Sequence, residues 1–235
     1  MYIKTCMKRN RVINITLVLI FGFCCNNIFG QHITFKRIES KLITNEGIEF
    51  VGDLKDRNSD LYSFPNWDNQ AVLFLDNNRY TLSNINFNVT TNSFDSRISR
   101  EKLFSFKSNE IDSVLINNLL FKNIGNSFYE VLFENRDNFL LKKHDITFQK
   151  GVDNRLGVGT LGKTKTLIAY NYLIKSGDLF KRVELNKSSI LSLVENDTNK
   201  DELENFIKNE HLSYKKVDDI ILIFKFILQN YNKII

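Results

Sequence analysis

The chain has 235 residues and a formal net charge of +5, from 32 Lys and Arg against 27 Asp and Glu. Residues 1–30 hold four of the basic residues and no acidic one, so residues 31–235 are nearly neutral, with 28 basic and 27 acidic side chains. This balance excludes the basic field that nucleic-acid binding needs, and the length suffices for one sizeable core. All three cysteines also lie in residues 1–30, which leaves the remainder without a disulfide or a thiol nucleophile.

Residues 1–30 predict a secretory signal peptide. Basic residues between Lys4 and Arg11 precede an apolar stretch from Val12 to Cys25, and the chain then passes through Gly30 to Gln31. A basic region, an apolar core and a small-residue exit in this order are typical of export signals. The apolar stretch has about 14 residues, whereas a membrane-spanning helix needs roughly 20. We therefore expect cleavage, and no membrane span in the mature chain.

Lipidation is the alternative fate of this segment. Cys24 or Cys25 ends the apolar stretch, but Phe23, rather than a small residue, precedes Cys24. We therefore favour a cleaved leader over a lipoprotein. The expected location is the periplasm or the vicinity of the outer membrane, with release from the cell as a less favoured outcome.

Residues 31–186 are expected to form an antiparallel β domain. Asp76-Asn77-Asn78 lies between the segments Ala71–Leu75 and Arg79–Leu82, a hairpin signature, and apolar residues alternate with Asn over residues 85–89. Turn signals recur roughly every 8–12 residues. Asn is abundant where the apolar pattern breaks, and it can replace Gly in tight turns. The pattern predicts a mainly β meander, closed into a barrel or folded as a sandwich.

Residues 187–235 predict a bundle of about three helices packed on the β domain, which makes the whole α+β. Ser188 and Ser189 can cap a first helix, Thr198 or Asn199 a second, and Ser213 can start a third. Acidic residues in the first turn of the second helix complement its dipole.

The last helix carries more apolar side chains than one stripe needs. Apolar residues at three- and four-residue spacing from Val217 to Tyr231 form the stripe, and Leu222, Ile223 and Phe226 fall off it. We interpret these three residues as a candidate partner surface. Burial of the helix on two sides is the alternative.

Trp67 is a second candidate contact residue. It follows Pro65 and is the only tryptophan of the chain. An exposed aromatic ring there can stack on a sugar or anchor a partner protein. A tryptophan that fills the end of a sheet is the alternative.

The sequence predicts no catalytic, cofactor-binding or metal-binding residue. Gly157–Thr164 matches a phosphate-binding loop, but a polar segment precedes it and half of a hairpin follows it, so we interpret it as a glycine-rich connection. His32, His144 and His211 lack companion ligands at metal spacing. Pairs of carboxylates distant in sequence stay open as glycosidase-type sites.

The chain resembles a group of uncharacterised exported proteins from Bacteroidota over roughly residues 60–235. The resemblance rests on the leader before Gln31 and on several short motifs: Phe64-Pro65 with Trp67, the hairpin from Val72 to Tyr80, Ile85 to Asn88, Phe128 to Leu132, Leu140 to Lys143, Tyr172-Leu173 and the lysine-rich tail. It implies location and architecture but supplies no catalytic residue.

Three functional hypotheses follow from the sequence. The first is a non-enzymatic binding or scaffolding protein of the cell envelope, with an envelope protein or glycan as partner. The second is a hydrolase of envelope glycan or lipid, which requires a pocket with two acids. The third is a carrier of an apolar ligand, which requires a closed β-barrel. The sequence sets no oligomeric state.

Overall fold

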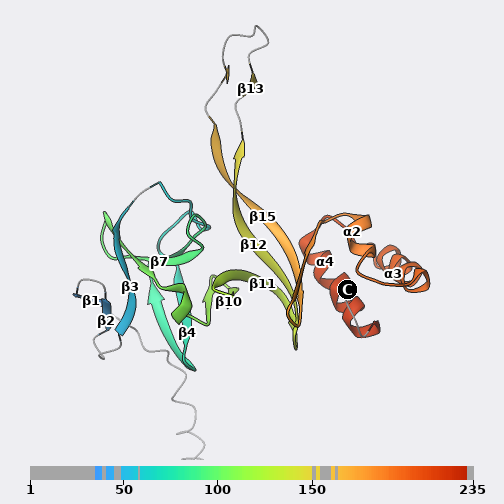
Figure 1. The fold of residues 1–235 in the computed structure, drawn as a ribbon, viewed down its shortest axis with the longest axis horizontal. Coiled ribbons are helices and arrows are strands. Elements are labelled where there is room, and N and C mark those ends of the chain that lie inside the picture. Colours follow the sequence, from blue (N-terminus) through green and yellow to red (C-terminus); the bar gives the residue numbers. More distant parts are fainter. Residues whose placement is uncertain are drawn as a thin grey trace, which may run out of the picture. The chain divides into compact units, whose positions relative to one another are not determined.

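The computed structural model describes residues 35–38, 41–44, 49–57, 59–149, 152–153, 160–161 and 164–231, with side chains in 50–57, 59–149 and 164–231 (Figure 1). The predicted signal peptide, His32 and all three glycines of the Gly157–Thr164 motif therefore lie outside the described residues. Residues Ile33–Ile235 form one unit by their contacts.

One antiparallel sheet has six strands. Their order is β1 (Phe35–Ile38), β2 (Lys41–Thr44), β3 (Glu49–Asp56), β8 (Lys102–Phe106), β7 (Ser93–Arg97) and β6 (Ile85–Asn88). Along β6 and β7 the side chains alternate, because Phe87 pairs with Phe94 on one face while Asn86 pairs with Asp95 on the other. The sheet thus has one apolar and one polar face.

The second antiparallel sheet has eight strands. Their order is β16 (Leu179–Val183), β15 (Lys165–Ser176), β12 (Asn138–Gln149), β11 (Ser127–Asn135), β10 (Leu119–Ile124), β9 (Ser113–Ile116), β4 (Gln70–Leu75) and β5 (Asn78–Ser83). A 3-10 turn, η1 (Ser108–Glu110), precedes β9, and β13 (Val152–Asp153) pairs with β14 (Thr160–Leu161) between β12 and β15. Both large sheets end in edge strands, so the described residues form no closed barrel.

The prediction of a mainly antiparallel β fold is confirmed, and of its two forms the barrel is wrong. The two sheets share a core in which the Phe87 ring lies 4.9 Å from that of Phe121 and the Phe94 ring lies 5.0 Å from that of Phe128, between centroids. Two sheets that pack face to face correspond to the sandwich, the other predicted form. The carrier hypothesis loses the closed barrel that it required.

Asparagine makes most of the tight turns. Among the described residues, nine other than glycine have positive φ, and six of these are Asn, so the expected replacement of Gly by Asn is confirmed. Asp76 and Asn77 form the predicted hairpin turn between β4 and β5, and Asn117 and Asn118 form the equivalent turn between β9 and β10. Two consecutive residues with positive φ match the twist of antiparallel strands.

Three helices follow β16, as predicted: α2 (Lys187–Leu191), α3 (Asp197–Asn209) and α4 (Val217–Asn230). The predicted caps are wrong by a few residues. Asn186 accepts from the N–H of Ser189, and Asn196 accepts from the N–H of Asn199, so each Asn satisfies a free donor of the first turn. No side chain caps α4, which begins after Lys216.

The helices pack on the eight-stranded sheet. Leu140, Ile174 and Val183 of the sheet join a second core with apolar residues of α2, α3 and α4. The hollow in this core has no space for a water molecule. The helical bundle therefore closes its interior against the sheet.

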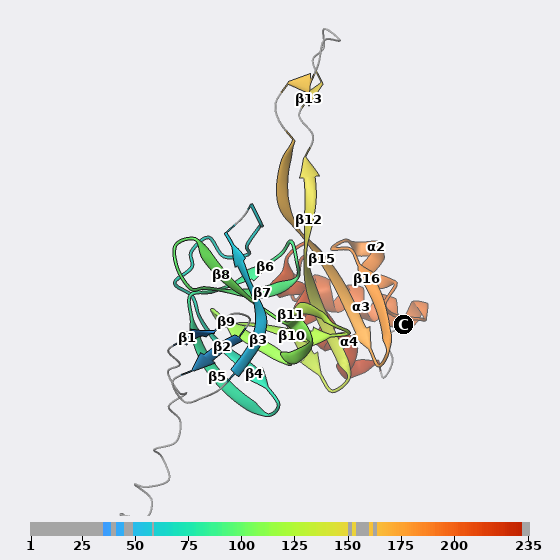
Figure 2. The same cartoon turned by 60° about the vertical axis from the view of Figure 1, so that its left-hand side comes forward.

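Strands β12 and β15 extend past their neighbours. They pair with each other from Asn138 to Gln149, but β11 pairs with β12 only as far as Lys142, and β16 with β15 only as far as Tyr172. Residues 143–149 and 165–171 therefore form a two-stranded ribbon, which continues beyond the rest of the sheet (Figures 1 and 2). We call this segment the ribbon.

The turn chemistry gives a stability prediction at Asn118, which is exposed and has a φ of 65°. Asn118→Ala should lower the free energy of unfolding by about 1 kcal/mol, because an alanine Cβ is strained at positive φ. Asn118→Gly should not, since glycine adopts this conformation freely. Urea unfolding of the three proteins checks this, and equal midpoints for the alanine variant and the wild type would contradict it.

Candidate functional site

Polar side chains lie between the two cores, on one face of the eight-stranded sheet. Along β12, Leu140 belongs to the helical core and Ile146 packs on the core between the sheets. Lys142 and His144 share their face, because alternate residues of a strand point the same way. Glu130 of β11 pairs with Lys142 in the register of the sheet. The sequence thus places charged groups where the two apolar cores meet.

Ser63, Glu130, Lys142 and His144 form a connected array, which we call the inner polar cluster. The Oγ of Ser63 lies 2.9 Å from Nδ1 of His144, and Nε2 of His144 lies 2.6 Å from Oε2 of Glu130. The Nζ of Lys142 lies 3.0 Å from the same Oε2. The side chains of His144 and Glu130 are 4% and 5% exposed. Both charged groups of the pair are therefore largely removed from water.

Aromatic rings enclose the imidazole of His144. Its centroid lies 5.6 Å from that of Phe87, 5.4 Å from that of Phe121 and 5.0 Å from that of Tyr170. The ammonium of Lys142 lies 4.4 Å from the centre of the Tyr170 ring, a cation–π distance. These contacts fix the orientation of the imidazole.

Glu130 is held in its ionised form. Burial alone would raise the pKa of its carboxyl, but hydrogen bonds from His144 and Lys142 outweigh burial and lower it. An ionised Glu130 accepts a hydrogen bond from the Nε2–H of His144. In a neutral imidazole with this tautomer, Nδ1 accepts the hydroxyl hydrogen of Ser63. Hydroxyl, imidazole and carboxylate then stand in the order found in serine hydrolases.

The groups around Ser63 lack a feature that this chemistry needs. Acyl transfer requires N–H donors aimed at the developing oxyanion. The N–H of Ser63 donates to the carbonyl of Phe87 at 3.0 Å, and the N–H of Phe64 donates to Oδ1 of Asn86 at 3.1 Å. Both nearby donors are in use. The cluster therefore fastens the segment around Ser63 to the sheet.

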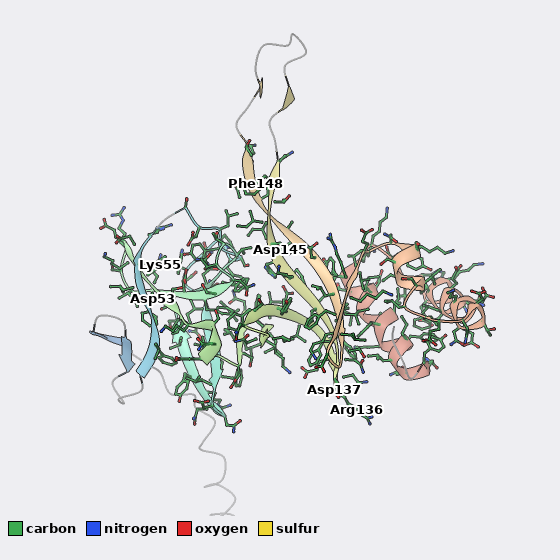
Figure 3. All side chains as sticks on the ribbon, viewed as in Figure 1. Asp53, Lys55, Arg136, Asp137, Asp145 and Phe148 are labelled. Carbon is green, nitrogen blue, oxygen red and sulfur yellow. The ribbon has the colours of Figure 1, made fainter. Side chains whose placement is uncertain are left out.

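A second buried array lies on the polar face of the six-stranded sheet. Oδ2 of Asp95 lies 2.8 Å from Nζ of Lys55, from the hydroxyl of Tyr62 and from Nδ2 of Asn88. Asp95 is fully buried, and its Oδ1 has no hydrogen-bond partner among the described residues. Burial and the Asp95 carboxylate raise the pKa of Tyr62, so its hydroxyl stays protonated. Figure 3 labels Lys55 on β3.

Trp67 covers this face instead of facing a partner. Its side chain is buried at 8% exposure, its ring lies 4.8 Å from that of Tyr62, and the Arg97 guanidinium lies 5.9 Å from its centre. The structure therefore places Trp67 as the sequence alternative had it, filling space over a sheet.

The three residues of the predicted partner surface do not share a surface. Leu222 is 45% exposed, but Ile223 is 1% exposed inside the helical core. The Phe226 ring stacks on Phe206 at 4.0 Å. The inward face of α4 carries Ile220, Phe224 and Ile227 of the predicted stripe, and Ile223 joins them there. Because α4 is apolar on most of its circumference, spacing alone fits either orientation.

Two open depressions bring acidic pairs together, as the hydrolase hypothesis requires. One of about 510 Å³ is lined by Asp56, Arg57, Arg100 and Glu101. Another, of about 410 Å³, includes Glu195 and Glu202 among its lining residues. All four carboxylates are exposed, and Asp56 pairs with Lys102. A general acid needs an environment that keeps it protonated at neutral pH, and exposed carboxylates lack one.

Three of the seven large apolar side chains that are exposed among the described residues lie on the ribbon. The seven are Phe148 (67%), Leu167 (43%), Tyr170 (48%), Leu115, Leu179 (74%), Phe180 and Leu222. The first three lie on the ribbon, whereas Phe180 has a ring neighbour in Tyr129 at 6.0 Å. Figure 3 shows Phe148 near the outer end of the ribbon and Asp145 closer to the body of the sheet. We call Phe148, Leu167 and Tyr170 the ribbon surface.

Comparison with known proteins finds no matching family model, no matching curated protein and no matching solved structure. Within the described residues, no three His, Cys, Asp or Glu side chains gather as ligands of a metal ion. None of the described helices is long and apolar enough to cross a membrane.

The inner polar cluster gives a prediction on acid stability. Glu130→Gln should lower the free energy of unfolding at pH 7 by about 2 kcal/mol, because Lys142, whose side chain is 19% exposed, loses a hydrogen-bonded carboxylate partner. Folding lowers the pKa of Glu130, so the stabilisation of the fold by its carboxylate is complete above the unfolded pKa of 4.5. This stabilisation is lost as the pH falls through the folded pKa. The difference between variant and wild type should therefore shrink below pH 4.5.

Urea unfolding at pH 7 and at lower pH measures this difference. Glu134→Gln is the matched control, because its carboxylate pairs with Lys122 on the same sheet but is 36% exposed. The control should cost less than about 1 kcal/mol. Equal stability of Glu130→Gln and Glu134→Gln at pH 7 would show that the buried cluster does not stabilise the fold.

Proposed function

We propose that this chain is a non-enzymatic, exported protein of the cell envelope that binds an envelope component through its ribbon. Export rests on the signal-peptide pattern of residues 1–30 and on the resemblance to exported proteins of Bacteroidota. Binding rests on the ribbon surface. The chemistry of the inner polar cluster supports a structural role for its charged groups.

The single observation that carries the proposal is the exposure of apolar side chains toward the outer end of the ribbon, where the two strands pair only with each other. Phe148 is 67% exposed at the outer end of the ribbon, and the paired strand exposes Leu167. Two strands without further neighbours are marginally stable in water, and their large apolar side chains gain free energy only when something covers them. A binding partner provides that cover.

Binding can be tested with cell envelopes from the organism that encodes the protein. The purified exported protein should sediment with the envelopes, and Phe148→Ser should weaken sedimentation at least about tenfold, because burying a Phe side chain contributes about 1.5–3 kcal/mol. Leu222→Ser is the control, since Leu222 is exposed to 45% on α4 and belongs to the surface that the sequence predicted. Thermal unfolding should be unchanged in both variants.

An unbound wild type, or a Phe148→Ser variant that binds as well as wild type, contradicts the proposal. If only Leu222→Ser loses binding, the binding site lies on α4 and not on the ribbon.

A serine hydrolase is the second candidate, and the contact between Ser63 and His144 favours it. A nucleophilic Ser63 would react with a fluorophosphonate probe, and Ser63→Ala would abolish the labelling. We expect no labelling above that of Ser63→Ala, because the neighbouring N–H groups already have acceptors. Intact mass after incubation with the probe measures the outcome. Stoichiometric labelling of Ser63 would replace the binding proposal by an enzymatic one.

A further inference from the structure

We propose that the component bound by the ribbon is an anionic lipid surface, with the ribbon lying at the level of the headgroups. This inference rests on the proposed function and names its partner. It starts from the placement of apolar side chains on both faces of the ribbon.

The ribbon exposes apolar groups on two opposite faces. Leu167 pairs with Thr147, and Phe148 pairs with Thr166. Paired residues of antiparallel strands share a face and successive residues alternate, so Phe148 and Leu167 point to opposite sides. A rigid protein surface covers one face of a flat ribbon. A lipid interface surrounds both.

Charge favours an anionic lipid. The ribbon carries Lys143 and Lys165 against Asp145, a net charge of +1. Lys143 pairs with Asp145 at 2.8 Å, and Lys165 is exposed. The helical residues 187–231 have six basic and eight acidic side chains, a net charge of −2. The two parts thus carry opposite net charge, and each Lys near an anionic membrane surface contributes about 1 kcal/mol.

The base of the ribbon has the composition of a membrane interface. Tyr170 is 48% exposed, and the Lys142 ammonium lies over its ring at 4.4 Å. Tyrosine and lysine suit the headgroup level, because each joins an apolar body to a polar end. Tyr170 and Phe148 thus lie at different distances from the body of the sheet, with the amphipathic ring at the base.

The backbone limits how deep the ribbon can enter. In residues 143–149 and 165–171 each strand pairs only with the other, so each has one edge without a strand partner. Free N–H and C=O groups cannot leave water for the hydrocarbon core without a cost of several kcal/mol each. The ribbon therefore rests among the headgroups and does not span.

Vesicle flotation tests the proposal with the purified exported protein. Vesicles of equal parts phosphatidylglycerol and phosphatidylcholine should float the wild type, and pure phosphatidylcholine should bind it about fivefold less. Phe148→Ser combined with Leu167→Ser should weaken binding to the anionic vesicles at least about tenfold. Leu222→Ser should bind like the wild type, because it changes an equally apolar exposed residue in the acidic helical part.

A tryptophan emission measurement locates the contact. Phe148→Trp should show a blue shift on addition of anionic vesicles, and Leu222→Trp should not. The single native Trp67 is buried in both variants and gives a constant background.

The outcomes separate this inference from the proposed function. Absence of flotation and of an emission shift overturns the lipid assignment. If envelopes still bind the protein, and protease treatment of the envelopes abolishes that binding, the ribbon binds a protein and the proposed function stands. If the wild type is a dimer by light scattering and the ribbon variant is a monomer, a second copy covers the ribbon, and the lipid assignment fails. If neither vesicles nor envelopes bind, both proposals fail.

Discussion

The ionised carboxylate of Glu130, shared by His144 and Lys142, is the interaction on which this arrangement depends. It lies between two apolar cores that use the same face of one sheet. An apolar residue in its place would merge the cores, whereas an unpaired charge there would cost several kcal/mol. Because two donors bind the carboxylate of Glu130, the polar group between the two cores has hydrogen-bond partners. His144 also reaches Ser63, so the same cluster fastens the segment before β4 to β12.

The same cluster shows why the presence of catalytic residue types does not establish catalysis. Ser63, His144 and Glu130 have the order and the distances of a nucleophilic array. Whether these residues have a catalytic or a structural role depends on whether the nearby N–H groups are free to bind an oxyanion. Because the N–H groups of Ser63 and Phe64 already have acceptors, the charge of a tetrahedral intermediate would meet no free donor from either. The hydrogen bonds that position Ser63 also occupy the N–H donors that an oxyanion hole would need.

The turns and the fold class could be predicted because they depend on residues close in sequence. The inner polar cluster could not, because its members are distant in sequence. Asp76 and Asn77 determine their turn by backbone preference alone, so the hairpin around them followed from the sequence. The orientation of α4 did not, because its apolar residues allow Ile221 or Ile223 to face inward. Ser63 lies 81 residues from His144, and nothing near either residue indicates the other. Lys142 and His144, polar residues on alternate positions of an apolar strand, were the available signal.

The exposed end of the ribbon follows from the order of residues along β12. Leu140 is fixed in the helical core, His144 in the inner polar cluster and Ile146 against the core between the sheets, while Phe148 faces water. Burial at the base supplies the free energy that holds the two strands together, since an isolated hairpin is marginal. Phe148 adds nothing to that burial, so folding does not require an apolar side chain there. Phe148 is therefore the side chain to which we assign the proposed contact outside the chain.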